Sequence, residues 1–187
     1  MRRNALVKLV EQPLLFIDCQ TTGATPQSAQ ILELGWLLPE VTAGQLPLSQ
    51  LLIKSRLIRL PADQALPNRI QKITGITDEL MQEASPAADV LSELMKDLSG
   101  GGQKQVKFAV AHYAQFEQAF VRQLFVDHLP EQSLPFTFIC TCQIAKRLYP
   151  DLPSRAIRAL GGYFGLSLTE MKRSSCHVEA TYFIWQR

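Results

Sequence analysis

Residues 14–26 read LLFIDCQTTGATP, an apolar run followed by one aspartate and a polar loop that contains Gly23 and Pro26. The run is short, which favours a buried strand over a helix. A strand that ends near Asp18 holds a carboxylate at the edge of a sheet. Gln20 follows at the same edge, because alternate side chains of a strand share a face. A second carboxylate at that position would begin a metal site, so the amide needs an explanation.

The rest of the chain predicts an α/β domain. We expect strands over 13–18, 29–38, 49–58, 106–111 and 135–141, and helices over 113–127, 141–148, 154–164 and 174–187. A further helix should begin at Ser85-Pro86, with Ser85 as its N-cap, and end at Gly100, and two short helical turns should flank Gly75. Three early strands form an antiparallel meander and later strands alternate with helices, so the pattern indicates a mixed sheet covered by helices.

Length and composition indicate one domain. The chain has 187 residues, of which 47% are apolar, and no run of eighteen apolar residues that could span a membrane. The first residues, MRRNALVKLVEQPLL, make a poor secretory signal and are expected to form a short element that leads into the first strand. The last predicted helix reaches Arg187 without a cap. We therefore expect a single domain over residues 1–187, compatible with a domain taken from a longer polypeptide.

Charge and cysteine content indicate what kind of partner and which redox compartment to expect. The net charge is +2, and the stretch from Cys140 to Arg187 carries seven Lys and Arg residues against three Asp and Glu residues. This basic third suits either a phosphate-bearing partner or a solvated surface. Cys140 and Cys142 have no second pair at zinc spacing, and we expect free thiols in a reducing cytoplasm.

Seven segments, taken in order, resemble the DnaQ-like 3′–5′ exonucleases. They are DCQTTG at 18–23, ILELG at 31–35, ITGIT at 73–77, AVAHYAQFE at 109–117, TCQIAKRLYP at 141–150, LGGYFGL at 160–166 and EAT at 179–181. The resemblance covers nearly the whole chain. It implies a ribonuclease H-like fold of three layers, with a mixed sheet of about five strands.

The resemblance also implies a two-metal hydrolase in which four acids hold Mg²⁺ or Mn²⁺ and a histidine five residues before the last acid is the base. Carried over by position, the first acid is Asp18 and the second position holds Gln20. The third and fourth positions hold Glu117 and Glu179 in place of aspartate, and the histidine position holds Ser174. Only Asp18 keeps the family's residue.

Each departure has a physical cost. Gln20 brings no charge, and each glutamate reaches about 1.5 Å further than aspartate. A displacement of about 1 Å can lower a rate about a hundredfold. Ser174 has no basic lone pair near neutral pH. We therefore expect weak metal binding and weak or absent hydrolysis, as in an enzyme fold that has lost its catalytic role.

Other residues near these motifs have two interpretations each. His177 would replace the missing base only if it faced the site, and its spacing from Glu179 puts the two on nearly opposite sides of a helix. Glu33 either supplies the charge missing at position 20 or is bonded to nearby backbone. His112 is expected to be structural, beside Tyr113, where the family usually has asparagine.

The resemblance implies that Thr21, Thr22 and Gly23 approach the 3′-terminal nucleotide of a single strand, although such residues also form ordinary turns. Phe116 either lines the nucleotide pocket or fills the core. Three functions stay open: a weakened exonuclease domain that binds nucleic acid within a larger DNA-processing protein, a working Mg²⁺- or Mn²⁺-dependent exonuclease that uses the three carboxylates, or a protein-interaction scaffold. A fused domain beyond Arg187 would be a further partner.

Overall fold

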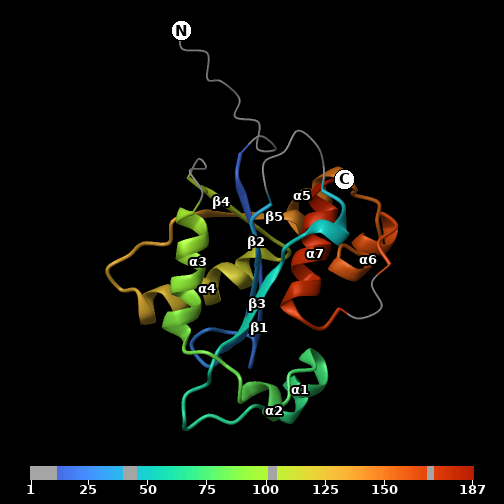
Figure 1. Ribbon diagram of the computed structural model, residues 1–187. Coiled ribbons are helices and arrows are strands. Elements are labelled where there is room, and N and C mark those ends of the chain that lie inside the picture. The colour runs from blue at the N-terminus through green and yellow to red at the C-terminus, as the bar shows by residue number, and fades with distance from the viewer. Residues whose placement is uncertain (1–11, 40–45, 101–104, 168–170) are drawn as a thin grey trace.

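A computed structural model describes residues 12–39, 46–100, 105–167 and 171–187. Within them lies a five-stranded sheet with the strand order β3-β2-β1-β4-β5 (Figure 1). The strands are β1 Leu14–Thr21, β2 Ile31–Leu37, β3 Lys54–Leu57, β4 Phe108–Ala111 and β5 Thr137–Cys140. β1, β2 and β3 pair antiparallel, whereas β4 pairs parallel with both β1 and β5. The predicted mixed sheet and its antiparallel meander are confirmed.

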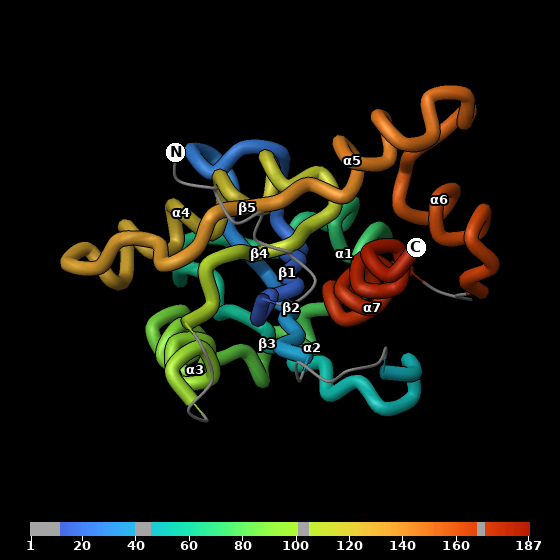
Figure 2. The backbone as a smooth tube through the Cα atoms, turned by 90° about the horizontal axis from the view of Figure 1, so that it is seen from above, coloured from blue at the N-terminus to red at the C-terminus, as the bar shows by residue number. Residues whose placement is uncertain are grey.

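Helices cover both faces of this sheet, which gives three layers (Figures 1 and 2). On one side lie α3 Ala87–Ser99 and α4 Ala114–His128. On the other lie α5 Thr141–Leu148, α6 Ile157–Tyr163 and α7 Ser174–Trp185. The predicted α/β class and the ribonuclease H-like layering are therefore confirmed.

The two faces of β1 are distinguished by alternation. Leu15 and Ile17 belong to the large apolar cluster that includes residues of α3 and α4. Leu14 and Phe16 belong to a second cluster with Val178 and Tyr182 of α7. Because side chains alternate along a strand, the next even-numbered residues, at positions 18 and 20, also face α7.

Between β3 and α3 the chain leaves the sheet and returns to it. The excursion contains α1 Asn68–Thr74 and α2 Asp78–Met81, on either side of Gly75, as predicted. At its base the backbone of Ser85 donates to Leu57 O at 3.0 Å and accepts from Arg59 N at 2.9 Å.

Two details of the predicted elements are wrong. Ser85 is not the N-cap of α3, because its backbone is bonded to the strand and Pro86 takes the N-cap position instead. The strand predicted over 49–58 is shorter, since a 3₁₀ turn over Leu48–Gln50 comes first and β3 spans only Lys54–Leu57.

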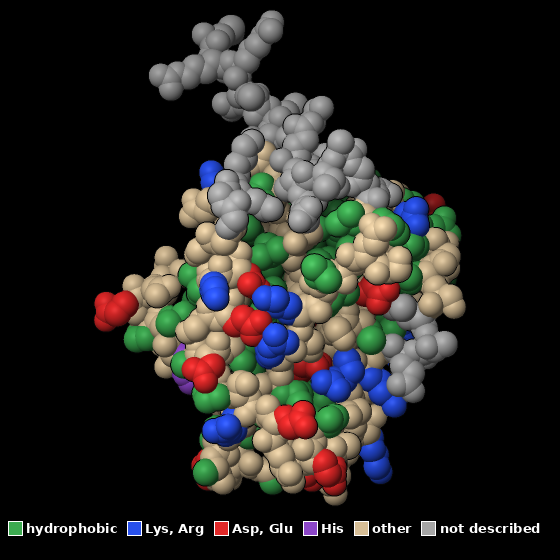
Figure 3. All heavy atoms as spheres, viewed as in Figure 1, with side chains coloured by type: hydrophobic (Ala, Val, Ile, Leu, Met, Phe, Trp, Pro, Cys, Tyr) green, Lys and Arg blue, Asp and Glu red, His purple; other side chains and the backbone are tan. Residues whose placement is uncertain are grey.

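Charged side chains on the face drawn in Figure 3 are of mixed sign and pair with one another. Lys54 lies 2.7 Å from Asp97 and 3.3 Å from Glu93, and Arg56 lies 2.8 Å from Glu93, so β3 and α3 are bridged by ion pairs. No helix among the described residues is long and apolar enough to cross a membrane. The element predicted for the first residues of the chain falls at 1–11, outside the described residues.

Candidate active site

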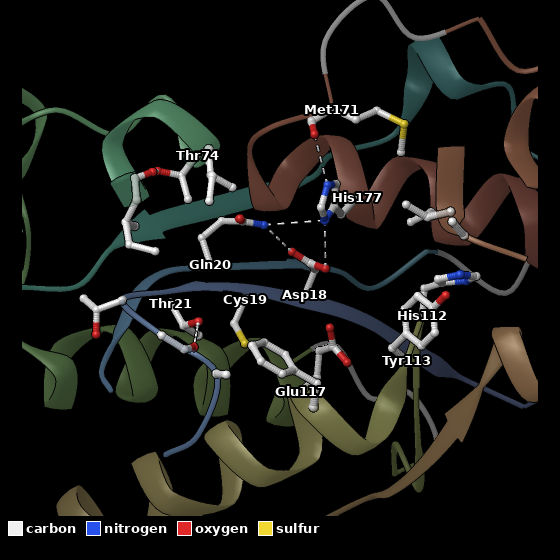
Figure 4. A pocket seen from close by; sticks show the side chains of 18 of the residues that line it. Asp18, Cys19, Gln20, Thr21, Thr74, His112, Tyr113, Glu117, Met171 and His177 are labelled. Carbon is white, nitrogen blue, oxygen red and sulfur yellow. Dashed lines mark hydrogen bonds and ion pairs between the residues drawn. The ribbon is translucent and has the colours of Figure 1, made fainter. Parts of the chain in front are cut away.

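A cleft of about 1140 Å³ opens at the end of β1 (Figure 4). Its walls come from the loop after β1, from α1, from the start of α4, from α6 and from α7. The lining residues are Asp18 to Ala24, Pro67, Arg69, Ile70, Ile73, Thr74, His112, Tyr113, Phe116, Glu117, Ala156, Ile157, Arg158, Met171 and His177. Segments far apart in the sequence therefore meet at the edge of the sheet where the motif begins.

Asp18 lies on the floor of this cleft and is only 5% exposed. Gln20 Nε2 donates to its Oδ2 at 3.0 Å, and His177 Nδ1 lies 3.2 Å from its Oδ1. Burial raises the pKa of the Asp18 carboxyl, while the bonds from His177 and Gln20 oppose that rise. Both carboxylate oxygens are therefore engaged by side chains of the protein.

His177 is held between two acceptors. Its Nδ1 faces Asp18, and its Nε2 lies 3.2 Å from the carbonyl oxygen of Met171. Only a doubly protonated imidazole can donate to both. Burial lowers the pKa of His177, but the bond to Asp18 and its negative charge outweigh burial and raise the pKa. The pKa values of Asp18 and His177 are thus both raised, and the two side chains form a hydrogen-bonded pair that shares a proton.

Glu117 projects from α4 toward Asp18 and is 5% exposed (Figure 4). Its Oε2 is buried and makes no hydrogen bond within the described residues. Burial, and then the negative charge of Asp18, raise the pKa of Glu117 to about 9. The side chain is therefore protonated at neutral pH, because two close carboxylates do not both ionise easily.

A family model described as exonuclease, RNase_T, matches residues 15–177. The chain belongs to this exonuclease family. The match runs from β1 to the histidine that contacts Asp18, and the fold is that of the DnaQ-like exonucleases.

Curated relatives of this exonuclease-family chain are much longer proteins. The PolC-type DNA polymerase III of Bacillus subtilis is 25% identical over 182 residues, which are 97% of this chain and 12% of that protein. The PolC-type polymerase of Halalkalibacterium halodurans is 27% identical over 98% of this chain, again 12% of that protein. The chain thus spans about one eighth of the length of these relatives.

Solved structures support the exonuclease fold. Exonuclease X in complex with 5′ overhanging duplex DNA superposes with a TM-score of 0.62 at 20% identity, over 91% of this chain and 89% of the other. Exonuclease I of E. coli in complex with a dT13 oligonucleotide gives 0.73 at 13% identity, over 94% and 40%. The cell-death related nuclease 4 gives 0.75 at 16% identity, over 94% and 62%.

The two residues of α7 that the exonuclease resemblance assigned to the site, Ser174 and Glu179, do not line the cleft in the described part of the chain. Ser174 is fully buried between α7 and the sheet, where its Oγ lies 3.2 Å from Ser55 Oγ. Glu179 is partly exposed and is not among the described residues that line the cleft. His177, which the sequence placed away from the site, is the residue of α7 that contacts Asp18.

The physical reason is helical geometry. Residues 177 and 179 point in widely different directions, as predicted. The segment EAT at 179–181 led us to expect Glu179 in the cleft, whereas His177 is the residue that faces it. If His177 takes the place of the last acid, the five-residue spacing places Lys172, not Ser174, at the histidine position. The structure accounts for this register, because Ser174 is small and packs against a glycine. A Cβ at Gly35 would lie 2.6 Å from Ser174 Oγ.

Glu33 is a structural carboxylate, one of the two interpretations of the sequence. It is 1% exposed, and it accepts bonds from Ser55 Oγ at 2.7 Å, from Arg173 Nε at 2.9 Å and from the backbone N of Ser174 at 2.8 Å. Burial alone would raise the pKa of Glu33, but these bonds hold it below its usual value. Its charge is thus neutralised at the start of α7 and does not replace the one missing at Gln20.

Thr21, Thr22, Gly23 and Phe116 all line the cleft. The threonine hydroxyls already have partners inside the loop, since Thr21 Oγ1 donates to Gly23 O at 2.7 Å and Thr22 Oγ1 accepts from Gln30 N at 2.8 Å. The Phe116 ring packs 4.8 Å from that of Phe120, so it contributes to the core as well as to the cleft wall.

His112 has a structural environment, as expected. It is 4% exposed, with Nδ1 at 2.8 Å from Thr141 Oγ1 and Nε2 at 2.8 Å from Arg155 O. Burial lowers the pKa of His112 to about 4, so the ring is neutral.

The residues of the cleft do not fit a pair of divalent cations. Asp18 is already bonded to Gln20 and His177, and Gln20 brings no charge. Hard cations need several oxygen ligands with negative charge. Across the described part of the chain, no group of three His, Cys, Asp or Glu side chains is arranged to hold a metal ion. Among the described residues that line the cleft, Glu117 Oε2 is a buried oxygen without a hydrogen-bond partner, and it is open to a ligand.

Proposed function

We propose that this exonuclease-family domain binds the 3′ end of a single-stranded nucleic acid and hydrolyses it weakly or not at all. The observation that carries the proposal is the engagement of both Asp18 oxygens by His177 and Gln20. A metal ion would have to displace both partners. In this proposal His177 is the counter-ion of Asp18 and takes the place that a metal ion would have.

Binding of nucleic acid is supported by the cleft itself and by the printed descriptions of the neighbours. Exonuclease X and Exonuclease I are described in complexes with DNA. The loop that carries Thr21 to Gly23 is retained in this chain. Arg69 and Arg158 line the cleft on α1 and α6, and both are exposed. Exposed cations at a cleft favour a phosphate backbone.

The test is fluorescence anisotropy with a labelled single-stranded oligonucleotide in EDTA, repeated over a series of salt concentrations. We expect binding without metal that weakens as salt rises, because phosphate contacts release counterions. An oligonucleotide blocked by a 3′-phosphate should compete less well than one with a free 3′-hydroxyl. An affinity that depends neither on the salt concentration nor on the 3′ end would contradict the proposal and would favour the protein-interaction scaffold.

A working exonuclease that depends on Mg²⁺ or Mn²⁺ is the second candidate, and the unpaired Glu117 Oε2 favours it. A 5′-labelled strand incubated with and without Mn²⁺ distinguishes the two. Rapid shortening that requires Mn²⁺ and is lost in Asp18→Ala would support the second candidate. Turnover comparable with that of Exonuclease I, assayed in parallel, would overturn the first.

A further inference from the structure

Tyr113 is an exposed aromatic residue at the mouth of the cleft, in an unusual backbone conformation. Its φ and ψ are 61° and 42°, and it is the one residue other than glycine with a positive φ in the described part of the chain. Its side chain is 51% exposed and lines the cleft. A bulky residue in the left-handed region costs free energy and is more common where function needs it.

The Tyr113 ring has a rigid neighbour. His112 meets it edge to face, with ring centroids 4.9 Å apart and planes at 83° (Figure 4). His112 is itself fixed by its bonds to Thr141 and Arg155. The tyrosine ring is therefore supported on one side and accessible over half of its surface, which is the requirement for stacking a flat ligand.

The walls beside Tyr113 are apolar and carry cations at their rims. Ile73 of α1 is 53% exposed and lines the same cleft, together with Ile157. Arg69 and Arg158 belong to the same lining. Flat apolar surface next to cations matches the two halves of an unpaired nucleotide, a base with π faces and an anionic phosphate.

We propose that Tyr113 is a base-stacking platform that holds the base of an unpaired nucleotide in this cleft. The inference rests on the proposed function, since it names how that site holds nucleic acid. Stacking tolerates any base, because each has a π face. Tyr113 therefore adds affinity without sequence preference and without any need for a metal ion.

The experiment compares Tyr113→Asn with Tyr113→Phe in the full chain. Asparagine adopts the left-handed conformation more readily than tyrosine, so Tyr113→Asn removes the ring without adding backbone strain. We expect Tyr113→Asn to weaken single-strand binding about 5- to 150-fold, whereas Tyr113→Phe stays within about 2-fold. Tyr163→Asn is the matched control, because Tyr163 is 59% exposed and is not among the described residues that line the cleft.

Two further measurements separate stacking from other effects. The slope of affinity against salt should be unchanged in Tyr113→Asn and smaller in Arg69→Gln, since only the second change removes a positive charge from the cleft lining. A second measurement uses a series of oligonucleotides, each with one abasic nucleotide at a different distance from the 3′ end. When the abasic position is the one that Tyr113 stacks on, Tyr113→Asn and Tyr113→Phe should bind with equal affinity. Wild-type binding with no loss in Tyr113→Asn would overturn the stacking inference alone. Absence of wild-type binding would overturn it together with the proposed function.

Discussion

The counter-ion interpretation predicts that two substitutions will create a metal site. In Gln20→Glu with His177→Asp, the amide and the imidazole that engage Asp18 both become carboxylates. In the wild-type cleft Gln20 and His177 occupy both oxygens of Asp18. With four ionised carboxylates the variant reaches a formal charge of about −4, as a cluster of acids around divalent cations requires.

The size of the stabilisation expected from Mn²⁺ follows from the linkage between metal binding and folding. If the variant binds Mn²⁺ with a Kd of about 10 μM, then 1 mM Mn²⁺ stabilises it by about 2.7 kcal/mol. For a chain of this size that raises Tm by roughly 5–10 °C. Without metal the variant should be less stable than wild type, because its carboxylates repel one another.

The assay is thermal unfolding in EDTA and in Mn²⁺, with calorimetric titration of Mn²⁺ to count sites. Gln20→Glu alone should respond weakly, because His177 still occupies Asp18. Glu179→Gln is the matched control, a charge change outside the residues that line the cleft. A large Mn²⁺ shift in wild type, or none in a folded double variant, would refute the counter-ion interpretation.

Two predictions concern stability. Gly35→Ala should lower the free energy of unfolding by about 1–3 kcal/mol through overpacking, since the new Cβ lies 2.8 Å from Ser174 Cβ. In urea unfolding, the double variant Gly35→Ala with Ser174→Gly should recover part of the lost stability. An unchanged midpoint in Gly35→Ala would contradict the close contact. Burial lowers the pKa of His112 to about 4, so His112 binds fewer protons in the folded than in the unfolded protein. The free energy of unfolding should therefore fall as the pH drops from about 6.5 to about 4, by about 3 kcal/mol in all. His112→Gln should flatten this part of the stability–pH curve, and a curve identical to wild type would show that another group is responsible.

The fold could be predicted because its signals are local. The run at 14–18 has the length and apolarity of a buried strand, and alternation alone places residues 18 and 20 on one face. Glycine, proline and helical periodicity marked α1, α2 and α3. The errors fell where tertiary contacts compete with local preference. Ser85 is a good N-cap residue, but its backbone bonds to the strand outweighed that role.

The site could be predicted only in part. Asp18, Gln20 and Glu117 were predicted to lie together from their places in the motifs that resemble the exonuclease family, and all three line one cleft. The orientation of α7 was not predicted, because Glu179 was taken as the acid of the last motif. In the structure the small side chain of Ser174 packs on Gly35, and His177 is the residue that faces the cleft. The pairing of His177 with Asp18 joins residues 159 positions apart, and local pattern carries no information about such a contact.

The excursion between Ile58 and Ser85 has a consequence for how this cleft can diversify. Its two ends are joined by backbone bonds at one point of the sheet, and its side chains Leu66 and Ile76 pack with Leu32 of β2. Exposed residues of the excursion can therefore change while Leu66 and Ile76 keep their contact with the sheet. That wall of the cleft can in this way vary in shape and in its preference for a ligand without moving Asp18.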